Sequence, residues 1–345
     1  MYNVSMRLSN GFKMFLILAT LLTVTYYLAS HRDIIDADAC ELERSYEIYL
    51  AKGETYDLQR DDLTSEDETI AVCEEGKIIG ISSGETTISA ACDTYTVKVS
   101  DLYTAPGIDM NKEYLPEERY TIEENRYLDD VLAYLIDQAG YQSRAGAIEA
   151  ARFLTLRFPY KLHYFYENGR MEREGMEADG EGRYYHTGLY LSSAKYAGIS
   201  ASMAKTGAWG TKIYEYSTDQ YTPNGLDCSG FITWALYNAG YDCGDIGAGP
   251  VPDTYDLTDL GKLVTIDEVK IEDLKCGDLT GLDGHIGMII GIDEEKIYIG
   301  EAYWVNDLQV RIYEKEEFLE KSEWEYVILM DEYYKEEGNY TPMWS

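Results

Sequence analysis

The stretch "NGLDCSGFITWALYNAG", Asn224 to Gly240, decides how the fold of this chain is interpreted. It contains Cys228, one of six cysteines in 345 residues, at the point where a Gly-Leu-Asp turn leads into an apolar segment. The spacing places Phe231 and Trp234 on one face of a helix that Gly240 ends. Such a cysteine can be a small core residue, half of a disulfide or a nucleophile, and most buried cysteines are inert.

The residues around Cys228 favour the third alternative. Asp227 is a good N-cap residue, so Cys228 and Ser229 fall in the first turn of the helix. The N–H groups of a first turn, together with the helix dipole, favour an anion. The position therefore predicts a lowered pKa for the Cys228 thiol, and the thiolate is the nucleophilic form. The same N–H groups can stabilise an oxyanion. Asp227 and Ser229 are expected to support the site.

A thiolate nucleophile needs a base, and the chain has four histidines. His31 follows the apolar N-terminal run, His163 follows a Pro-containing segment, and His186 lies in or beside a Gly-rich loop. His285 differs, because it begins a strand in "CGDLTGLDGHIGMIIGIDEEKIYIGEAYW" (276–304), a segment with the pattern of a β-hairpin. His285 is therefore the candidate base.

Alternation along this hairpin places His285 and Gly287 on one face, and Glu301 on the same face of the return strand. An odd-length loop around Asp293–Glu295 would then set Glu301 opposite or diagonal to His285. A carboxylate there would orient the imidazole and stabilise the imidazolium, the third part of a nucleophile–base–orienter set. We also expect Gly287 and Gly291 to leave room on this face for the helix bearing Cys228.

The segments "LDCSGFITWAL", "CGDLTGLDGHIGMIIG" and "IYIGEA" together resemble the NlpC/P60 family of cell-wall cysteine peptidases. The family has "DCSGF" at its nucleophile and "GDL…HVGIYIG" at its base, which correspond to Cys228 and His285. Its third polar position is most often His, with Asn, Gln or Glu as variants, and corresponds to Glu301. The match runs from about residue 207 to 326.

The resemblance implies a papain-like α+β fold in which the helix carrying the cysteine packs on an antiparallel sheet carrying the histidine. It implies hydrolysis of peptide bonds in peptidoglycan stems without a metal or other cofactor, commonly between D-γ-glutamyl and a diamino acid. The family also uses an aromatic residue upstream of the nucleophile, and the candidates here are Tyr190, Trp209 and Tyr214. The sequence itself has no zinc-site, regular calcium-loop or nucleotide-binding motif.

Upstream of this region, residues 45–101 read as short strands punctuated by glycines, as in a small β-sandwich. The segment "KGETYDL…DETIAVCEEGKIIGISSGETTISAACDTYTVKV" resembles the bacterial Ig-like group 2 (BIG2) family, which implies a spacer or binding role at cell surfaces. Residues 102–121 read as a linker. Apolar residues at helical spacing then predict one helix that ends at Gly140 and a second that ends before Pro159.

The N-terminus carries an apolar run, "MFLILATLLTVTYYLA" (14–29), preceded by Arg7 and Lys13. This pattern predicts a membrane anchor over 1–30 with the remainder outside the cell, and a cleaved secretory signal is the alternative. Export permits disulfides, and Cys73 with Cys92, in neighbouring predicted strands, is the first candidate pair.

The full expectation is a multidomain chain: a transmembrane helix, an all-β Ig-like sandwich, and a papain-like α+β domain over 122–345 with a helical front half. A net charge of −34 argues against binding to nucleic acids or to anionic lipid headgroups. The expected partners are peptidoglycan or its muropeptides, and the membrane through the N-terminal helix. Two other functions stay open: a CHAP-like amidase or acyltransferase, and a non-catalytic surface-binding protein.

Overall fold

The computed structural model describes most of the chain from residue 43 onward. The described residues are 43–107, 113–115, 121–162, 164, 188–189, 226–243, 246–248, 257–320 and 322–344. They belong to two compact units, one of residues 43–48 with Thr55–Val99 and one of Tyr49–Glu54 with the described residues from 100 on. None of the helices in these ranges combines the length and hydropathy needed to cross a bilayer, and the predicted anchor at 1–30 lies outside them.

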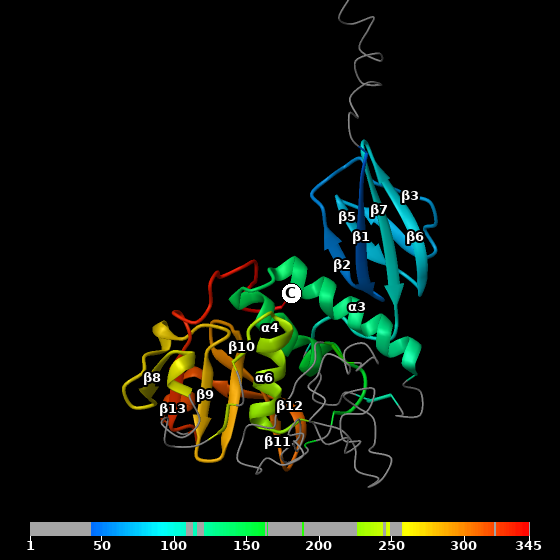
Figure 1. Cartoon of the computed structure of the whole chain (residues 1–345). Coiled ribbons are helices and arrows are strands. Elements are labelled where there is room, and N and C mark those ends of the chain that lie inside the picture. Colours follow the sequence, from blue (N-terminus) through cyan, green and yellow to red (C-terminus); the bar gives the residue numbers. More distant parts are fainter. Residues whose placement is uncertain are drawn as a thin grey trace, which may run out of the picture. The chain divides into compact units, whose positions relative to one another are not determined.

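The first unit is built of two small sheets (Figure 1). One sheet has the order β1 (Arg44–Ala51), β7 (Asp93–Ser100), β6 (Gly84–Ala90) and β3 (Thr64–Ser65). The other has the order β2 (Thr55–Asp57), β5 (Lys77–Gly80) and β4 (Ala71–Glu74). Alternate residues of β7 are buried, as expected for strands with one face on a core, and Ile78, Ile88 and Val97 are fully enclosed. The unit is therefore all-β.

The pairing predicted for Cys73 and Cys92 is wrong. Cys73 has a free thiol, whereas Cys92 is disulfide-bonded, so the two do not pair with each other. The physical reason lies in the sheet order, because Cys73 belongs to β4 of the three-stranded sheet and Cys92 lies in the turn between β6 and β7 of the other sheet. Strands that are close in the sequence are here divided between two sheets.

The second unit is α+β, with helices packed on a six-stranded sheet (Figure 1). Its sheet has the order β12 (Asp307–Glu314), β11 (Lys296–Tyr303), β10 (His285–Ile292), β9 (Leu279–Leu282), β13 (Tyr326–Leu329) and β8 (Lys262–Thr265). Its helical elements are α3 (Ile122–Ala139), α4 (Arg144–Arg152), a π-helical turn η2 (Phe153–Arg157), α6 (Cys228–Asn238), α7 (Lys315–Glu320) and the short 3-10 turns η5 (Leu257–Leu260) and η6 (Ile271–Asp273).

Both predicted front-half helices are present, and their ends follow from local sequence. Thr121 caps α3 in a capping box with Glu124, and Gly140, with φ of 120°, stops it. The second helix changes from α to π geometry at Phe153, five residues before Phe158 takes an extended conformation ahead of Pro159. Pro159 restricts the residue before it to such extended conformations.

Helix α6 is buried on almost every side. The sequence predicted only one apolar, buried face. All residues from Cys228 to Leu236 are buried. One side of α6 packs against α4 and another against β10 and β11. The helix that begins with Cys228 is therefore fixed between the front-half helices and the centre of the sheet.

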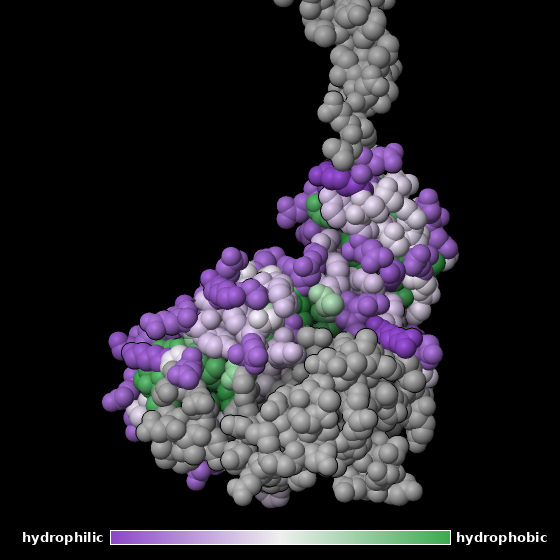
Figure 2. Space-filling view, in the orientation of Figure 1, coloured by the Kyte–Doolittle hydropathy of each residue, from purple (hydrophilic) through white to green (hydrophobic). Residues whose placement is uncertain are grey.

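Hydrophilic side chains cover most of the described surface that Figure 2 shows, as the net charge of −34 leads one to expect. The large apolar side chains that are exposed are Tyr46, Ile81, Tyr114, Tyr141, Trp304, Val305 and Ile312. Trp304 and Val305 are neighbours in the turn between β11 and β12, immediately after Tyr303.

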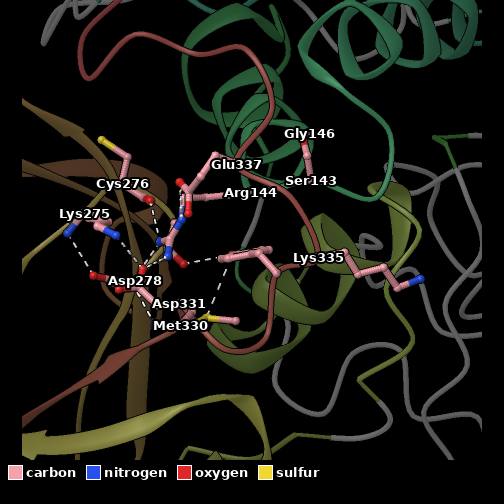
Figure 3. Close-up of polar contacts among 12 residues, drawn as sticks. Ser143, Arg144, Gly146, Lys275, Cys276, Asp278, Met330, Asp331, Lys335 and Glu337 are labelled. Carbon is pink, nitrogen blue, oxygen red and sulfur yellow. Dashed lines mark hydrogen bonds and ion pairs between the residues drawn. The ribbon is translucent and has the colours of Figure 1, made fainter.

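A buried arginine ties the front half to the sheet and to the C-terminal segment (Figure 3). Arg144, fully enclosed at the start of α4, donates to Asp278 Oδ1 and to the Cys276 carbonyl, each at 3.0 Å. It also forms ion pairs with Asp331 and Glu337. Burial raises the pKa of Asp278, and Arg144 is among the groups that oppose this shift. The arginine thus compensates a carboxylate that would otherwise be costly to bury.

Replacing Arg144 with Met should lower the free energy of unfolding of this unit by about 3–5 kcal/mol, because the substitution leaves Asp278 buried without its cation. The measurement is urea denaturation followed by a probe in the second unit. Lys275→Met is the matched control, since Lys275 is 45% exposed and also pairs with Asp331, at 2.8 Å. That change should cost less than about 1 kcal/mol. Equal losses for the two variants would contradict the importance given to Arg144.

Candidate active site

Cys228 is the first residue of α6, and Asp227 caps the helix in front of it. Asp227 Oδ1 accepts a hydrogen bond of 2.6 Å from the backbone N–H of Gly230. The Ser229 hydroxyl lies 3.4 Å from the same oxygen. Asp227 and Ser229 are both buried, so this capping arrangement is held inside the protein. It fixes the direction in which the first turn, and with it the Cys228 side chain, leaves the preceding segment.

The thiol of Cys228 lies beside the beginning of β10. Its Sγ is 3.9 Å from the carbonyl oxygen of Gly284, the residue before His285. Tyr326 of β13 approaches the same place, and its ring covers Gly281, where a Cβ would come within 2.4 Å of the ring and hydroxyl. Burial and, after it, interaction with Cys228 raise the pKa of the Tyr326 hydroxyl. The surroundings of the thiol therefore include a buried phenol.

His285 and Glu301 form a buried hydrogen-bonded pair. His285 Nε2 lies 2.7 Å from Glu301 Oε2, and the two residues are 5% and 0% exposed. The imidazole is held between two aromatic rings: it stacks on Trp324 at 5.4 Å between centroids and meets the edge of Tyr303 at 5.0 Å. Carboxylate and rings together restrict the imidazole to one orientation.

The other oxygen of Glu301 is also fully engaged. Glu301 Oε1 accepts hydrogen bonds of 2.7 Å from Gln309 Nε2 and from Arg311 Nε, both on β12. Burial works against the charge of Arg311, but Glu301 and its other hydrogen-bond partners raise the pKa of the guanidinium, so it stays a cation. The carboxylate is consequently compensated on both oxygens, which is the condition for burying it completely.

The strand register explains how the pair forms. Met288 of β10 pairs with Gly300 of β11, so the next pair in this antiparallel ladder sets Gly287 against Glu301, two residues from His285. A Cβ on Gly287 would lie 3.4 Å from Glu301 Cβ and 2.6 Å from Ile299 Cγ2. The missing side chain at position 287 therefore leaves space for the Glu301 carboxylate to cross diagonally to the imidazole.

The expected role of the glycines on this row was wrong. A β-bulge lies between Ile289 and Gly291, so the alternation predicted for the whole strand changes before Gly291, which faces Trp344. Helix α6 packs on the opposite face of the hairpin, where a Cβ on Gly300 would lie 3.4 Å from Phe231 Cζ. The glycine that admits the helix is thus Gly300, and Gly287 serves the pair of His285 and Glu301.

The structure brings Cys228, His285 and Glu301 to the region where α6 and β10 begin, with Asp227 and Ser229 behind the thiol. Several residues considered in the sequence analysis lie outside the described ranges: Tyr190, Trp209 and Tyr214 as upstream aromatics, and His31, His163 and His186 as other histidines. The part of the chain that the structure describes contains no cluster of three or more His, Cys, Asp or Glu residues suited to a metal ion.

Sequence reasoning missed four residues of this site: Gln309, Arg311, Trp324 and Tyr326. A usable signal existed for the first two. In the β11–β12 ladder Glu301 pairs with Gln309 and Ile299 with Arg311, so strand alternation alone puts both polar side chains on the face of Glu301. Trp324 and Tyr326 come from the chain after α7, and no local pattern links them to His285 or Cys228.

Comparison with known proteins adds little information about the function of this site. No protein-family model matches the chain. Among solved structures, a similar chain is the P60 domain of an antigen from M. avium subspecies paratuberculosis. It is 12% identical, the match covers 62% of this chain and 99% of that chain, and the TM-score is 0.24. This likeness is weak.

Gly287→Ala should lower the free energy of unfolding by about 1–3 kcal/mol, because the added methyl group collides with Ile299 beside Glu301. Urea denaturation measures the loss. Gly107→Ala is the control, since a Cβ there meets no atom within 4 Å, and it should change stability by no more than about 0.5 kcal/mol. If Gly287→Ala left the free energy of unfolding unchanged, the space beside Ile299 and Glu301 would not require a glycine.

Proposed function

We propose that this protein is a cysteine peptidase that hydrolyses peptide bonds in the stem peptides of peptidoglycan. The observation that carries the proposal is the buried hydrogen bond of 2.7 Å between His285 and Glu301, next to the residue whose carbonyl contacts the Cys228 thiol. A thiol at a helix start, an imidazole and an orienting carboxylate are the parts that nucleophilic acyl transfer requires.

The assignment of the two imidazole nitrogens follows from the hydrogen bond. Because Glu301 is held as a carboxylate by Arg311 and Gln309, Nε2 of His285 carries the hydrogen and donates it to Glu301. This tautomer leaves Nδ1 as the basic nitrogen. In the proposed mechanism Nδ1 removes the proton of the Cys228 thiol.

The reaction then proceeds in two balanced steps. The Cys228 sulfur forms a bond to the scissile carbonyl carbon, the first-turn N–H groups of α6 stabilise the oxyanion, and the C–N bond breaks as His285 gives its proton to the leaving amine. Water next attacks the thioester while His285 accepts a proton from it. The C–S bond breaks, the carboxylic acid leaves, and the Cys228 and His285 pair is restored.

The substrate class rests on the resemblance of "LDCSGFITWAL", "CGDLTGLDGHIGMIIG" and "IYIGEA" to the NlpC/P60 family, whose members cleave wall peptides. On this basis the bond between D-γ-glutamyl and the diamino acid is the proposed cleavage point. A CHAP-like amidase acting between muramoyl and alanine would use the same thiol and base. The apolar run at 14–29 and the BIG2-like segment at 45–101 lead us to propose export, anchoring at the membrane and an Ig-like spacer before the enzyme.

Cys228→Ala should abolish the release of fragments from purified peptidoglycan, with a rate at least about 10³-fold below that of the parent chain, because no nucleophile remains. Mass spectrometry of the muropeptides identifies the bond that is cut. Cys73→Ala is the control, since it removes a free thiol from the other unit. Undiminished cleavage by Cys228→Ala would refute the proposal, and new free amines only at muramoyl–alanine would replace the endopeptidase with the amidase.

The thiols of Cys228, Cys276 and Cys73 should also differ in reactivity. At pH 7 iodoacetamide should modify Cys228 first, because a thiolate is favoured at a helix N-terminus beside a histidine. Burial raises the pKa of Cys276 to about 11, so only about one molecule in 10⁴ carries a thiolate there at pH 7. Burial also raises the pKa of Cys73. Peptide mass spectrometry over time measures the three rates, and equal rates would contradict an activated Cys228.

A further inference from the structure

The carboxylate of Glu301 accepts hydrogen bonds on both of its oxygens. Its Oε2 faces His285, and its Oε1 accepts from Arg311 and Gln309, all at 2.7 Å. With an exposed fraction of 0%, this carboxylate has little water to spread its charge. The negative charge of Glu301 that Arg311 compensates is therefore less available to stabilise the imidazolium that forms when His285 accepts a proton.

Arg311 is held in place as firmly as the imidazole. Its Nη1 donates to the Tyr313 hydroxyl at 3.0 Å and pairs with Glu323. Its guanidinium lies over the rings of Tyr303, at 4.9 Å, and Trp324, at 5.6 Å. Those two rings are the ones that enclose the imidazole of His285. One aromatic pair thus orients both the guanidinium and the imidazole around a single carboxylate.

We propose that Arg311 is a positioning residue that sets the basicity of His285 by sharing the Glu301 carboxylate with it. This role rests on the proposed function of His285 as a base. An unshared buried carboxylate would bind the proton on the imidazole tightly, because nothing else would compensate its charge. With Arg311 present, the ring keeps its orientation while its proton stays transferable. A general base works best when its pKa lies near the working pH.

Other titratable groups flank the pair, and they must be the same in all the variants that are compared. They are Cys228 on α6, Asp283 in the β9–β10 turn, Tyr303 on β11, Tyr313 on β12, Glu323 after α7 and Tyr326 on β13. In the proposed mechanism Cys228 exchanges a proton with the imidazole, so the two groups would titrate together. Replacing Cys228 with Ala in every variant removes that coupling, so that the imidazole titrates as a single group.

The experiment is an NMR titration of the His285 imidazole in the full chain, in the Cys228→Ala background, with the signal assigned by its loss in His285→Gln. Arg311→Met should raise the pKa of His285 by about one unit or more, because the carboxylate is no longer shared. Arg311→Lys restores a cation and should return at least about half of that shift. If Arg311→Met does not fold, Arg311→Gln takes its place, with the same upward shift expected.

The control is Lys296→Met. Lys296 is a cation of the same hairpin, five residues along β11 from Glu301, 38% exposed and 3.8 Å from Glu314. Removing this exposed charge, about 16 Å along the strand, should move the pKa of His285 by no more than about 0.2 unit. An unchanged or lowered pKa in Arg311→Met, or an equal shift in Lys296→Met, overturns the proposal.

The titration needs no substrate, so its outcome is separate from that of the proposed function. A parent chain that cleaves no peptidoglycan, combined with the upward shift, would refute the peptidase and keep the sharing of Glu301. A parent chain that cleaves peptidoglycan, with no shift in Arg311→Met, would refute only the role given to Arg311. A purely structural Arg311 would alter stability and leave the pKa of His285 where it is.

Discussion

The complete burial of the Glu301 carboxylate constrains how strands β10, β11 and β12 of the second unit are arranged. A carboxylate removed from water destabilises a protein unless charged or polar donors replace the lost hydration. Here the donors come from two other strands: His285 on β10, and Gln309 with Arg311 on β12. A slip of one residue in either ladder would turn these side chains to the wrong face. The register of these strands and the orientation of the imidazole are thus both tied to this carboxylate.

The two faces of the β10–β11 hairpin contact different parts of the protein. One face carries Glu301, its partners and the aromatic rings around His285, while the other receives α6 through Gly300. Cys228 nevertheless lies beside the start of the strand that carries His285, because its thiol is 3.9 Å from the Gly284 carbonyl oxygen. The Arg144 network holds α4 to the sheet, and α4 in turn packs on α6. The position of the thiol therefore depends on interactions far from it in the sequence.

Much of this arrangement follows from short-range patterns. The capping role of Asp227 can be predicted from the turn before the helix. Alternation predicted Glu301 opposite or diagonal to His285, but by way of an odd-length loop. In the structure Ile292 pairs with Ile297 across four residues, and the β-bulge brings the odd-numbered residues of both strands to one face. What local patterns could not give is the β-bulge before Gly291, because an extra residue in a strand leaves no clear trace in the alternation of apolar side chains. Trp324 and Tyr326 reach the site by tertiary packing alone, and the separation of Cys73 from Cys92 depends on which sheet each strand joins.

The central claim is that Cys228, with His285 oriented by Glu301, forms a covalent intermediate with a wall peptide. Trapping that intermediate tests the claim most directly: the full chain is mixed with muropeptide, quenched in acid within the first turnover, digested and analysed by mass spectrometry. The account predicts an acyl group bound through a thioester to the peptide that contains Cys228. Hydrolysis that proceeds with no acyl group on Cys228, or with one on a different residue, would contradict it.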